Sequence, residues 1–430
     1  MEEFLSELVE RMGRVERRKW ASIYIRGLLL EGQRKSIEPM ASRLPGADVQ
    51  ALRQFVSQSP WPEQPVQEAL AFKLLERLKP EVWIVDETSF PKAGNHSVGV
   101  ERQYCGALGK IANCQVAVSL HLSHEQFSCP IFWSLHLPKS WSEDQERRQE
   151  AKVPEKVSYQ SKQEQALALL EKARQAQLPL LPVLADSFYG NTFEFRRQLR
   201  QWQWPYAVEV EPETVAWQTE PSLKVTKQPA ATGRPRLLPP QEEIAQALSL
   251  KAIAQSWPKS AWKKLSWKEG SKGQLRSRFA CGPIWAAHAW RKRQRLERQE
   301  ELLLVEWPLQ SSDPVKYYLL WFQGEKKSLK EMARLAHGRW RVELDYRELK
   351  DELGLDDFEG RHWAGFHHHA TLVSLAYGFL QWSRAGKSGR SSKRPHPYPA
   401  ATAPPNATPP GPPHRLLPPL PALLPQLNLT

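Results

Sequence analysis

The sequence predicts a mixed α/β protein with a helical region at its N-terminus. Three observations support this class. Residues 1–78 read as helices, because their apolar residues cluster between capping and turn residues. From about residue 80, short apolar runs typical of strands are interleaved with helical segments. Near residue 340, a helical segment places charged residues at helical spacing.

Within the helical region, two short helices are predicted around a turn at residues 45–46, which are Pro and Gly. Ser36 and Asp48 stand at their N-cap positions. The pair suits a helix-turn-helix, whose second helix would enter the major groove of DNA, although an ordinary helical hairpin has the same pattern. Residues 1–78 are therefore predicted to form a helical DNA-binding domain.

Residues 79–205 are predicted to form the first part of a catalytic core. A convincing helix at residues 162–176 leads into an apolar run that ends at Asp186. Three strands, a helix and then a fourth strand are the order of a ribonuclease-H-like sheet, with parallel pairing where the helix crosses over. Strands are expected before this helix at residues 82–85, 99–104, 115–122 and 131–135, one more than that order requires.

Residues 206–325 interrupt this α/β rhythm and are predicted to be a largely β insertion. The core should resume at residues 326–383, with a helix that starts near Ser328 and carries Glu343, and a last helix at 367–382. Residues 384–430 differ in kind, since thirteen of the last 36 residues are proline. Such a tail cannot build a packed core and is expected to be disordered or polyproline-like.

Charge and cysteine content narrow the class of protein. The formal net charge of +13 favours an anionic polymer as partner, although many soluble proteins are basic, so charge alone decides nothing. No run approaches the roughly 20 apolar residues of a membrane span, and the acidic start does not resemble a signal peptide. The four cysteines lack the paired spacing of a zinc site, and so few thiols in a long chain favour a reducing cytoplasm: Cys105, Cys114, Cys129 and Cys281.

Three acids form the candidate catalytic and metal site. Asp86 and Asp186 end apolar runs, and Glu343 lies on a helix. Arg339 precedes Glu343 by four residues and Lys350 follows it by seven, so all three project from one helical face. Carboxylate oxygens suit Mg²⁺, and two hard cations suit phosphodiester chemistry. On a basic chain, this pattern predicts an enzyme that cuts and joins DNA.

Each acid also has a purely structural interpretation. Asp86 could be an exposed strand end, Asp186 could cap a helix, and Glu343 could form only ion pairs. Rival acids are expected to face elsewhere. Glu87 should point to the opposite side of its strand, and Asp345 and Glu348 lie about 200° and 140° around the helix from Glu343.

Four histidines near the end of the core suggest a zinc site: His362, His367, His368 and His369. Three consecutive histidines cannot all face one ion on a helix, and no thiol is near in the sequence. Packing or phosphate contact is therefore the preferred interpretation.

With these residues in place, the chain resembles an insertion-sequence transposase of the DDE superfamily. It is similar to the branch whose third acid lies in a Tyr-x2-Arg-x3-Glu-x6-Lys signature, which Arg339, Glu343 and Lys350 match in identity and spacing. Residues 85–88 and 184–190 resemble the family's first-acid and second-acid strands, and the resemblance covers roughly residues 10–383. The family's Tyr falls on Ala336, and Tyr346 lies elsewhere on the helix.

The resemblance implies a ribonuclease-H-like, retroviral-integrase-like core split by a β insertion. We expect two Mg²⁺ ions, with Mn²⁺ as a substitute. Asp86 would bridge them, while Asp186 and Glu343 would each complete one. Hydrolysis would free a 3′-hydroxyl at the element end, and that hydroxyl would attack target DNA. Arg339 and Lys350 would bind phosphates.

The expected partners are double-stranded DNA, as element ends and target, and a second copy of the chain in a homodimer on DNA. The expected location is the bacterial cytoplasm, at the nucleoid. A tryptophan of the insertion could stack on a flipped base, as the resemblance suggests. Trp257, Trp262 and Trp267 are the candidates, and Trp267 is favoured because it lies in a predicted hairpin.

Two other functions stay open. Ala336 and the proline-rich tail suit a catalytically decayed, DNA-binding relative of a transposase. A ribonuclease-H-like nuclease that hydrolyses DNA without strand transfer would use the same three acids.

Overall fold

The computed structural model describes residues 1–32, 34–221, 226–228, 236–238, 246–270, 273–287 and 299–388. The predicted proline-rich tail lies outside the described residues from position 389 onward. Among the described helices, none combines the length and apolarity that crossing a membrane requires.

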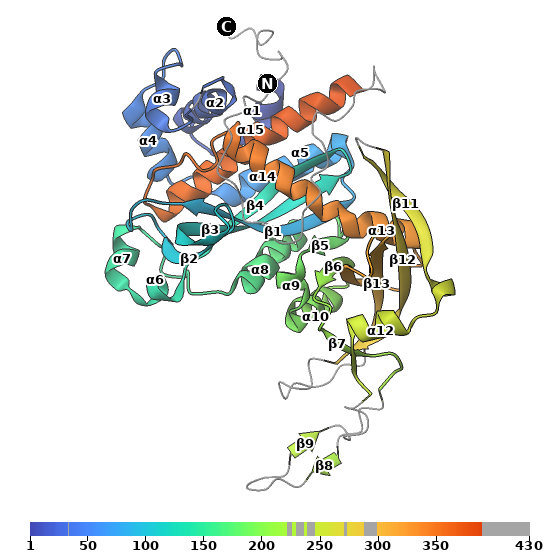
Figure 1. Cartoon of the computed structure of the whole chain (residues 1–430). Coiled ribbons are helices and arrows are strands. Elements are labelled where there is room, and N and C mark those ends of the chain that lie inside the picture. The colour runs from blue at the N-terminus through green and yellow to red at the C-terminus, as the bar shows by residue number, and fades with distance from the viewer. Residues whose placement is uncertain are drawn as a thin grey trace.

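A mixed sheet runs through the described part of the molecule (Figure 1). Its twelve strands follow the order β10-β7-β12-β13-β14-β6-β5-β1-β3-β2, with β4 also paired to β3 and β11 also paired to β12. A separate small hairpin pairs β8 with β9. The strands are β1 Val82–Pro91, β2 Glu101–Cys105, β3 Lys110–His124, β4 Phe127–Leu135, β5 Val183–Ala185, β6 Tyr206–Val210, β7 Val215–Trp217, β8 Thr226–Gln228, β9 Arg236–Leu238, β10 Leu248–Ser249, β11 Lys263–Gly270, β12 Gly273–Ala286, β13 Glu300–Pro308 and β14 Lys316–Trp321.

The central strands carry the predicted topology. Strands β1, β3 and β4 pair antiparallel, whereas β5 pairs parallel with both β1 and β6. The chain reaches β5 through α8 (Lys162–Gln175), whose first turn is fixed by a capping box between Ser161 and Glu164. This mixed α/β arrangement fits a ribonuclease-H-like sheet.

Strand β1 corrects one prediction. The apolar run at residues 82–85 ends at Asp86, but the strand continues to Pro91. It continues because β3 remains paired with it, from Asp86 opposite Ser119 to Pro91 opposite Cys114. Asp86 therefore lies inside β1, and only the shorter neighbour β5 ends at its level.

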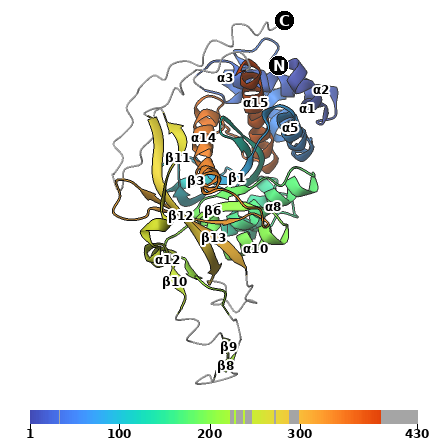
Figure 2. The same ribbon diagram turned by 90° about the vertical axis from the view of Figure 1, so that its right-hand side faces the viewer.

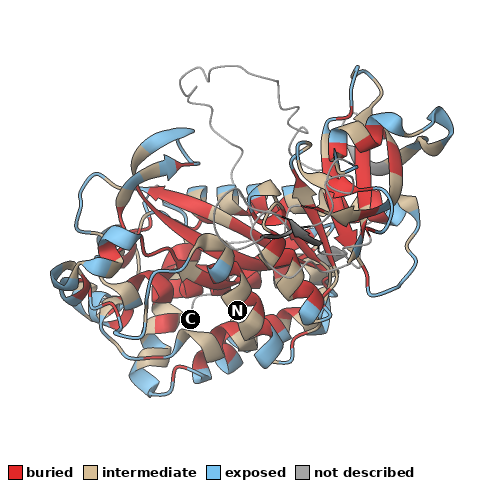
Figure 3. Ribbon diagram, turned by 90° about the horizontal axis from the view of Figure 1, so that it is seen from below, coloured by how far each residue is buried: buried red, intermediate tan, exposed pale blue. Residues whose placement is uncertain are grey.

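Helices cover both sides of this sheet. The first five helices gather around the long C-terminal helix α15 on one side, and α8 and α10 lie on the other (Figures 1 and 2). Figure 3 shows the buried strands between these helical layers. The helices are α1 Glu2–Glu10, α2 Val15–Leu29, α3 Ile37–Ala41, α4 Val49–Ser57, α5 Glu63–Leu78, α6 Lys139–Glu143, α7 Gln145–Glu150, α9 Ser187–Gly190, α10 Phe193–Gln201, α12 Leu250–Ser256 and α15 Trp363–Ser388.

The predicted helix pair at residues 36–56 is present as α3 and α4. Asp48 caps α4, since its carboxylate accepts a hydrogen bond from the backbone N–H of Ala51 at 2.7 Å. Ser36 occupies the N-cap position of α3, as predicted, although its side chain makes no capping hydrogen bond. Whether the pair binds DNA stays a prediction.

The segment that carries Glu343 also differs from the prediction. A helix does start at Ser328, but this helix, α13, spans only Leu329–Ala336. A 3-10 turn, η3 (His337–Trp340), separates it from α14 (Arg341–Asp351). A Cβ atom on Gly338 would lie 2.9 Å from the Leu184 side chain, so glycine lets this turn approach β5 closely.

The β-rich stretch continues the central sheet. Strand β14 pairs antiparallel with β6, and β13 and β12 follow it outward. Strands β11 and β12 form the hairpin that was predicted around Trp267. The boundaries of the predicted domains remain predictions.

Candidate active site

Asp86 is the most enclosed of the three predicted acids, with 8% of its surface exposed. One carboxylate oxygen accepts a hydrogen bond from the Glu87 backbone N–H at 2.7 Å. The other accepts one from the Arg339 guanidinium, also at 2.7 Å. Among the described residues, Arg339 is thus the one cation in contact with the Asp86 carboxylate.

The Asp86 carboxyl group is hard to ionise in this setting. Burial raises its pKa to about 7, the Arg339 charge opposes that rise, and the nearby Asp186 carboxylate adds to it. A shift of this kind means that the surroundings do not compensate the negative charge. A divalent cation beside Asp86 would favour the ionised form.

Asp186 lies next to Asp86 because of strand register. Ile84 pairs with Leu184 across the parallel strands, so two further residues bring positions 86 and 186 level. One Asp186 oxygen accepts a hydrogen bond from the Phe188 backbone N–H at 3.1 Å and caps α9. The helix-cap interpretation is therefore correct, and it coexists with the closeness to Asp86.

Arg339 is the residue around which the predicted acids gather. Its guanidinium bonds Asp86 and lies 3.6 Å from a carboxylate oxygen of Glu343. Burial lowers its pKa, but the carboxylates of Asp86, Asp186, Glu209 and Glu343 more than offset this and raise it. The structure thus brings the three predicted acids around one positive charge.

Glu343 differs from the aspartates in exposure. Its side chain is 66% exposed and its described ion pair is the one with Arg339. It projects from the first turn of α14, which the 3-10 turn delivers beside β5. A loosely held carboxylate at the rim can turn toward a ligand at small energetic cost.

The donor set fits a hard divalent cation, since all three predicted ligands are carboxylates. The Arg339 guanidinium lies between the carboxylates of Asp86 and Glu343, so this site already accommodates a positive charge. Among the described residues, however, no three His, Cys, Asp or Glu side chains are arranged as a ready metal cluster. A small cavity nearby, lined by residues such as Glu81, His124 and Arg334, does not include the three acids.

Lys350 lies farther along the same face of α14. Its ammonium group donates a hydrogen bond to the Ser89 carbonyl at 2.8 Å, three residues beyond Asp86 on β1. Burial lowers its pKa. The lysine therefore lies beside the Asp86 strand but not beside Arg339, so the two cations could contact different phosphates.

The rival acids face elsewhere, as predicted. Glu87 receives bonds from Lys162 of α8 and from the Tyr189 hydroxyl, on the other side of the sheet from Arg339. Asp345 is fully buried and contacts His121. Glu348 accepts a hydrogen bond from the Tyr377 hydroxyl.

Sequence reasoning missed Glu209 on β6. Ala185 pairs with Val208, so Glu209 lies level with Asp186, and its charge contributes to the raised pKa of Arg339. A Lys316 ammonium 3.5 Å away balances it. Because the run at residues 206–210 was assigned to an insertion, nothing in the sequence placed this acid near the others.

The three consecutive histidines are buried and make packing contacts, as preferred from the sequence. Each contacts a different part of the chain: His367 bonds to Trp363, His368 to Val56 and Trp61, and His369 to Tyr24 and Gly354. Burial lowers the pKa of His369 to about 4. These contacts attach α15 to the helical layer.

The remaining predicted DNA contact is Trp267. It lies at a bulge in β11, between Ser266 and Lys268, but its side chain is outside the described part of the structure. The alternatives Trp257 and Trp262 pack against each other, with Trp307 next in the same aromatic cluster. Ala336, which stands where the signature has tyrosine, is buried in an apolar cluster with Leu184 and Val342.

Two comparisons with known proteins show which family the chain belongs to. A family model described as a DDE superfamily endonuclease matches residues 7–274, a span that includes Asp86 and Asp186 and ends before Glu343. A probable transposase for insertion sequence element IS701, from Microchaete diplosiphon, is 31% identical over 169 residues, which is 39% of this chain. The match covers 41% of that relative's own length. Since the family model spans more than half of the sequence, the chain belongs to the DDE superfamily of endonucleases.

Proposed function

We propose that this protein is a DNA transposase, which cuts the ends of an insertion sequence and joins them to target DNA. Family membership and the likeness to a probable transposase support an endonuclease that acts on DNA. The observation that carries the proposal is the under-compensated Asp86 carboxylate, level with Asp186 and joined through Arg339 to Glu343. Groups with strongly shifted pKa values and a specific charge partner are typical of functional sites.

Asp86, Asp186 and Glu343 would hold Mg²⁺, or Mn²⁺ in its place, with Asp86 shared between two ions. When bound, such ions lower the pKa of a water and stabilise the leaving oxygen of a phosphodiester. Hydrolysis at the element end then frees a 3′-hydroxyl, and attack of that hydroxyl on target DNA joins the two.

The basic residues of the site would bind the DNA backbone. Arg339 can offer a phosphate a bidentate fork, while Lys350 acts as a point charge beside Ser89. The lowered pKa of Lys350 would rise again next to a phosphate, because a negative charge favours the ammonium form. Trp267, in the β11–β12 hairpin, is the proposed partner for an unpaired base.

The rest of the proposal concerns partners. Helices α3 and α4 are the proposed contact with the major groove. Cutting and joining two element ends requires two active sites on one DNA complex, so we propose a homodimer when DNA is bound. We also propose that the protein works at the bacterial nucleoid.

A second candidate function has an observation in its favour. Ala336 removes the tyrosine of the signature, which suits a relative that binds DNA without cutting it. A nuclease without strand transfer is a third candidate.

The test uses the full chain with a duplex that contains the terminal inverted repeat found beside its coding region. With Mg²⁺, wild type should release a 3′-hydroxyl end and, after target DNA is added, a joined product. Asp86→Asn and Glu343→Gln should each reduce cleavage by at least about 10³-fold while DNA binding stays within a few-fold. The matched control Glu348→Gln, one turn farther along α14, should cleave nearly as wild type does.

The alternatives give different products. Cut ends that never join would favour the nuclease, and DNA binding without any cutting by a folded protein would favour the decayed relative. Full cleavage by Asp86→Asn would refute the assignment of the site.

A further inference from the structure

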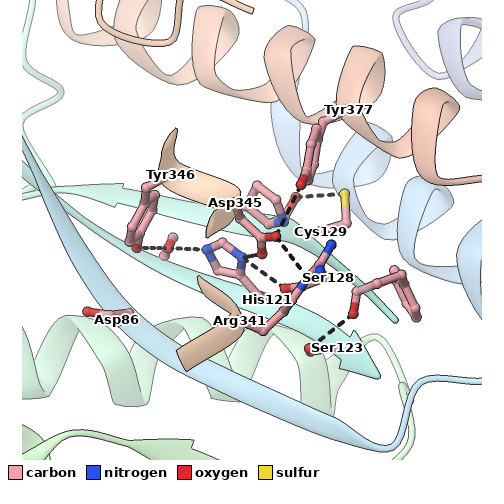
Figure 4. A network of polar contacts seen from close by, with 12 residues as sticks. Asp86, His121, Ser123, Ser128, Cys129, Arg341, Asp345, Tyr346 and Tyr377 are labelled. Atoms are coloured by element: carbon pink, nitrogen blue, oxygen red, sulfur yellow. Dashed lines mark hydrogen bonds and ion pairs between the residues drawn. The ribbon is translucent and has the colours of Figure 1, made fainter. Parts of the chain in front are cut away.

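A buried chain of polar groups lies behind Asp86 and connects α14 with β3 (Figure 4). From α14 it includes Asp345 and Tyr346, and from β3 it includes His121 and Ser119. The roles assigned above to Asp86, Asp186, Glu343, Arg339 and Lys350 make no use of these groups.

The chain is continuous at hydrogen-bond distance. Asp345 Oδ2 lies 3.2 Å from His121 Nδ1, and His121 Nε2 lies 2.8 Å from Ser119 Oγ. Ser119 Oγ in turn lies 2.7 Å from the Tyr346 hydroxyl. Ser119, His121 and Asp345 have no exposed surface, so water does not compete for these bonds.

The far end of the chain fixes the order of its protons. Asp345 lies 3.1 Å from the Tyr377 hydroxyl, which shares its one proton with Glu348 at 2.9 Å, and 3.6 Å from the Arg341 guanidinium, which suits a carboxylate. A carboxylate receives the Nδ1–H of His121, which leaves Nε2 as an acceptor for the Ser119 hydroxyl. Ser119 then accepts from Tyr346, and the lone pairs of the phenol oxygen remain free to accept from another donor.

The near end of the chain lies at the proposed active site. Ser119 is the cross-strand partner of Asp86. The pKa of Tyr346 is raised, chiefly by burial and then by the charge of the Asp86 carboxylate. In Figure 4 Tyr346 and Asp86 lie on the same side of His121. The tyrosine follows Glu343 by three residues and precedes Lys350 by four, which places all three on one face of α14.

We propose that Tyr346 is a positioning residue of the active site, and that the buried Asp345–His121–Ser119 chain holds its hydroxyl in place. The face of α14 is then attached to the β1–β3 pair by Tyr346 on Ser119 and by Lys350 on Ser89, and α14 begins directly after the turn that brings Arg339 to Asp86. These contacts set the height and rotation of Glu343 relative to Asp86. This inference rests on the proposed function, since it assigns a role in the same reaction.

Removing one oxygen atom tests the proposal. In Tyr346→Phe the ring still fills its space, so packing is kept and only the bond to Ser119 is lost. We expect single-turnover cleavage to slow by about 10- to 100-fold, because small misplacements of a ligand cost that much. The Mg²⁺ concentration for half-maximal cleavage should rise by about tenfold, a change that a role in stability alone would not produce.

A matched control is Tyr206→Phe, which removes another buried hydroxyl, bonded to Glu301 at 2.5 Å. Tyr206 begins β6, whereas Glu209 lies near the other end of that strand, so the Tyr206 hydroxyl is away from Asp86, Asp186 and Glu343. This variant should lose stability but keep the wild-type rate and Mg²⁺ dependence. An equal effect of the two substitutions on Mg²⁺ dependence would overturn the proposal.

Coupling to the chain gives a second readout. If Tyr346 acts through Ser119, then Ser119→Ala combined with Tyr346→Phe should cleave within about twofold of Tyr346→Phe alone. Multiplying effects would mean independent roles and would overturn the positioning chain. If wild type does not cleave DNA at all, both the proposed function and this inference are overturned. If wild type cleaves and Tyr346→Phe is unimpaired, this inference alone is overturned.

Discussion

Two buried carboxylates in this molecule have the same kind of partner and opposite behaviour. Glu301 on β13 is 1% exposed and bonds Arg196 at 2.7 Å, with Arg200 at 3.3 Å and the Tyr206 hydroxyl at 2.5 Å. Burial raises its pKa, but the two arginines outweigh burial and lower the pKa to about 2. Asp86 also has an arginine, yet its pKa rises to about 7.

The difference lies in the balance of charge. At Glu301, two guanidinium groups contact the same carboxylate, so folding itself neutralises the acid. At Asp86, one guanidinium is shared with Asp186, Glu209 and Glu343, so negative charge remains in excess. A buried charge left without compensation costs stability, and proteins retain such groups where a ligand completes them. Glu301 is therefore a structural acid, and Asp86 is a candidate binding group.

The largest effect on stability should come from the compensated acid. Glu301→Gln removes the buried carboxylate that both Arg196 and Arg200 contact, so we expect a loss of about 3–5 kcal/mol in the free energy of unfolding. Urea denaturation at pH 7 measures it, with the exposed neighbour Glu300→Gln as the control, expected within about 0.5 kcal/mol of wild type. If Glu301→Gln lowers the free energy of unfolding no more than Glu300→Gln does, the contrast between Glu301 and Asp86 is contradicted.

Neutralising Asp86, the uncompensated acid, should instead raise the free energy of unfolding, by an amount that depends on pH. An acid whose pKa is higher in the folded chain binds more protons when folded, so stability falls as pH rises through that window. For Asp86 the window runs from 3.8 to about 7. Asp86→Asn should therefore equal wild type in stability near pH 4 and exceed it by on the order of 2–4 kcal/mol at pH 8 without divalent ions.

The same measurement applied to Glu301 gives the reverse slope. Its pKa falls from 4.5 to about 2, so its contribution is present above pH 4.5 and is lost as pH falls toward 2. Denaturation curves of wild type, Asp86→Asn and Glu301→Gln between pH 3 and 8 distinguish the two acids. Parallel curves for Asp86→Asn and wild type would contradict the raised pKa of Asp86.

A smaller effect should follow from adding Mg²⁺. If Mg²⁺ binds at the acids with a Kd near 1 mM, then 10 mM Mg²⁺ should stabilise wild type by about 1.4 kcal/mol through mass action. Asp86→Asn should lose this response, and Glu301→Gln should keep it. Thermal unfolding with and without Mg²⁺ measures the shift, and an equal response in Asp86→Asn would place ion binding elsewhere.

The smallest effect is expected at Glu209. Its Lys316 partner and partial exposure make it a surface ion pair, so Glu209→Gln should change stability by less than about 0.5 kcal/mol. Cleavage should stay within about tenfold of wild type, because Arg339 keeps its bond to Asp86. A fall in cleavage comparable to that of Asp86→Asn would make Glu209 a fourth acid of the site.

Much of the candidate site could be predicted from local pattern. Parallel strands joined by a helix meet at the same edge, so Asp86 and Asp186 were expected to be close, and their register agrees. Helical spacing placed Arg339 with Glu343, and their charges lie 3.6 Å apart although a 3-10 turn intervenes. Strand alternation and helical spacing also predicted correctly that Glu87, Asp345 and Glu348 face away from the site.

Other features depend on neighbours that no local pattern identifies. Strand β1 passes beyond Asp86 because β3 supplies backbone partners there. Glu209 reaches Arg339 only because β6 joins the central sheet beside β5. Tyr346 meets Ser119 across 227 residues of sequence.

The sequence by itself determined the class of fold and the helical face that carries Glu343, and it predicted the three acids of the candidate site. These follow from apolar periodicity and residue spacing, which act over one strand or a few helical turns. Only the tertiary structure decided that one arginine would be shared among several acids and that Asp86 would be buried without full compensation. Burial and charge balance depend on which distant groups pack together, and those long-range contacts set the pKa values that distinguish Asp86 from Glu301.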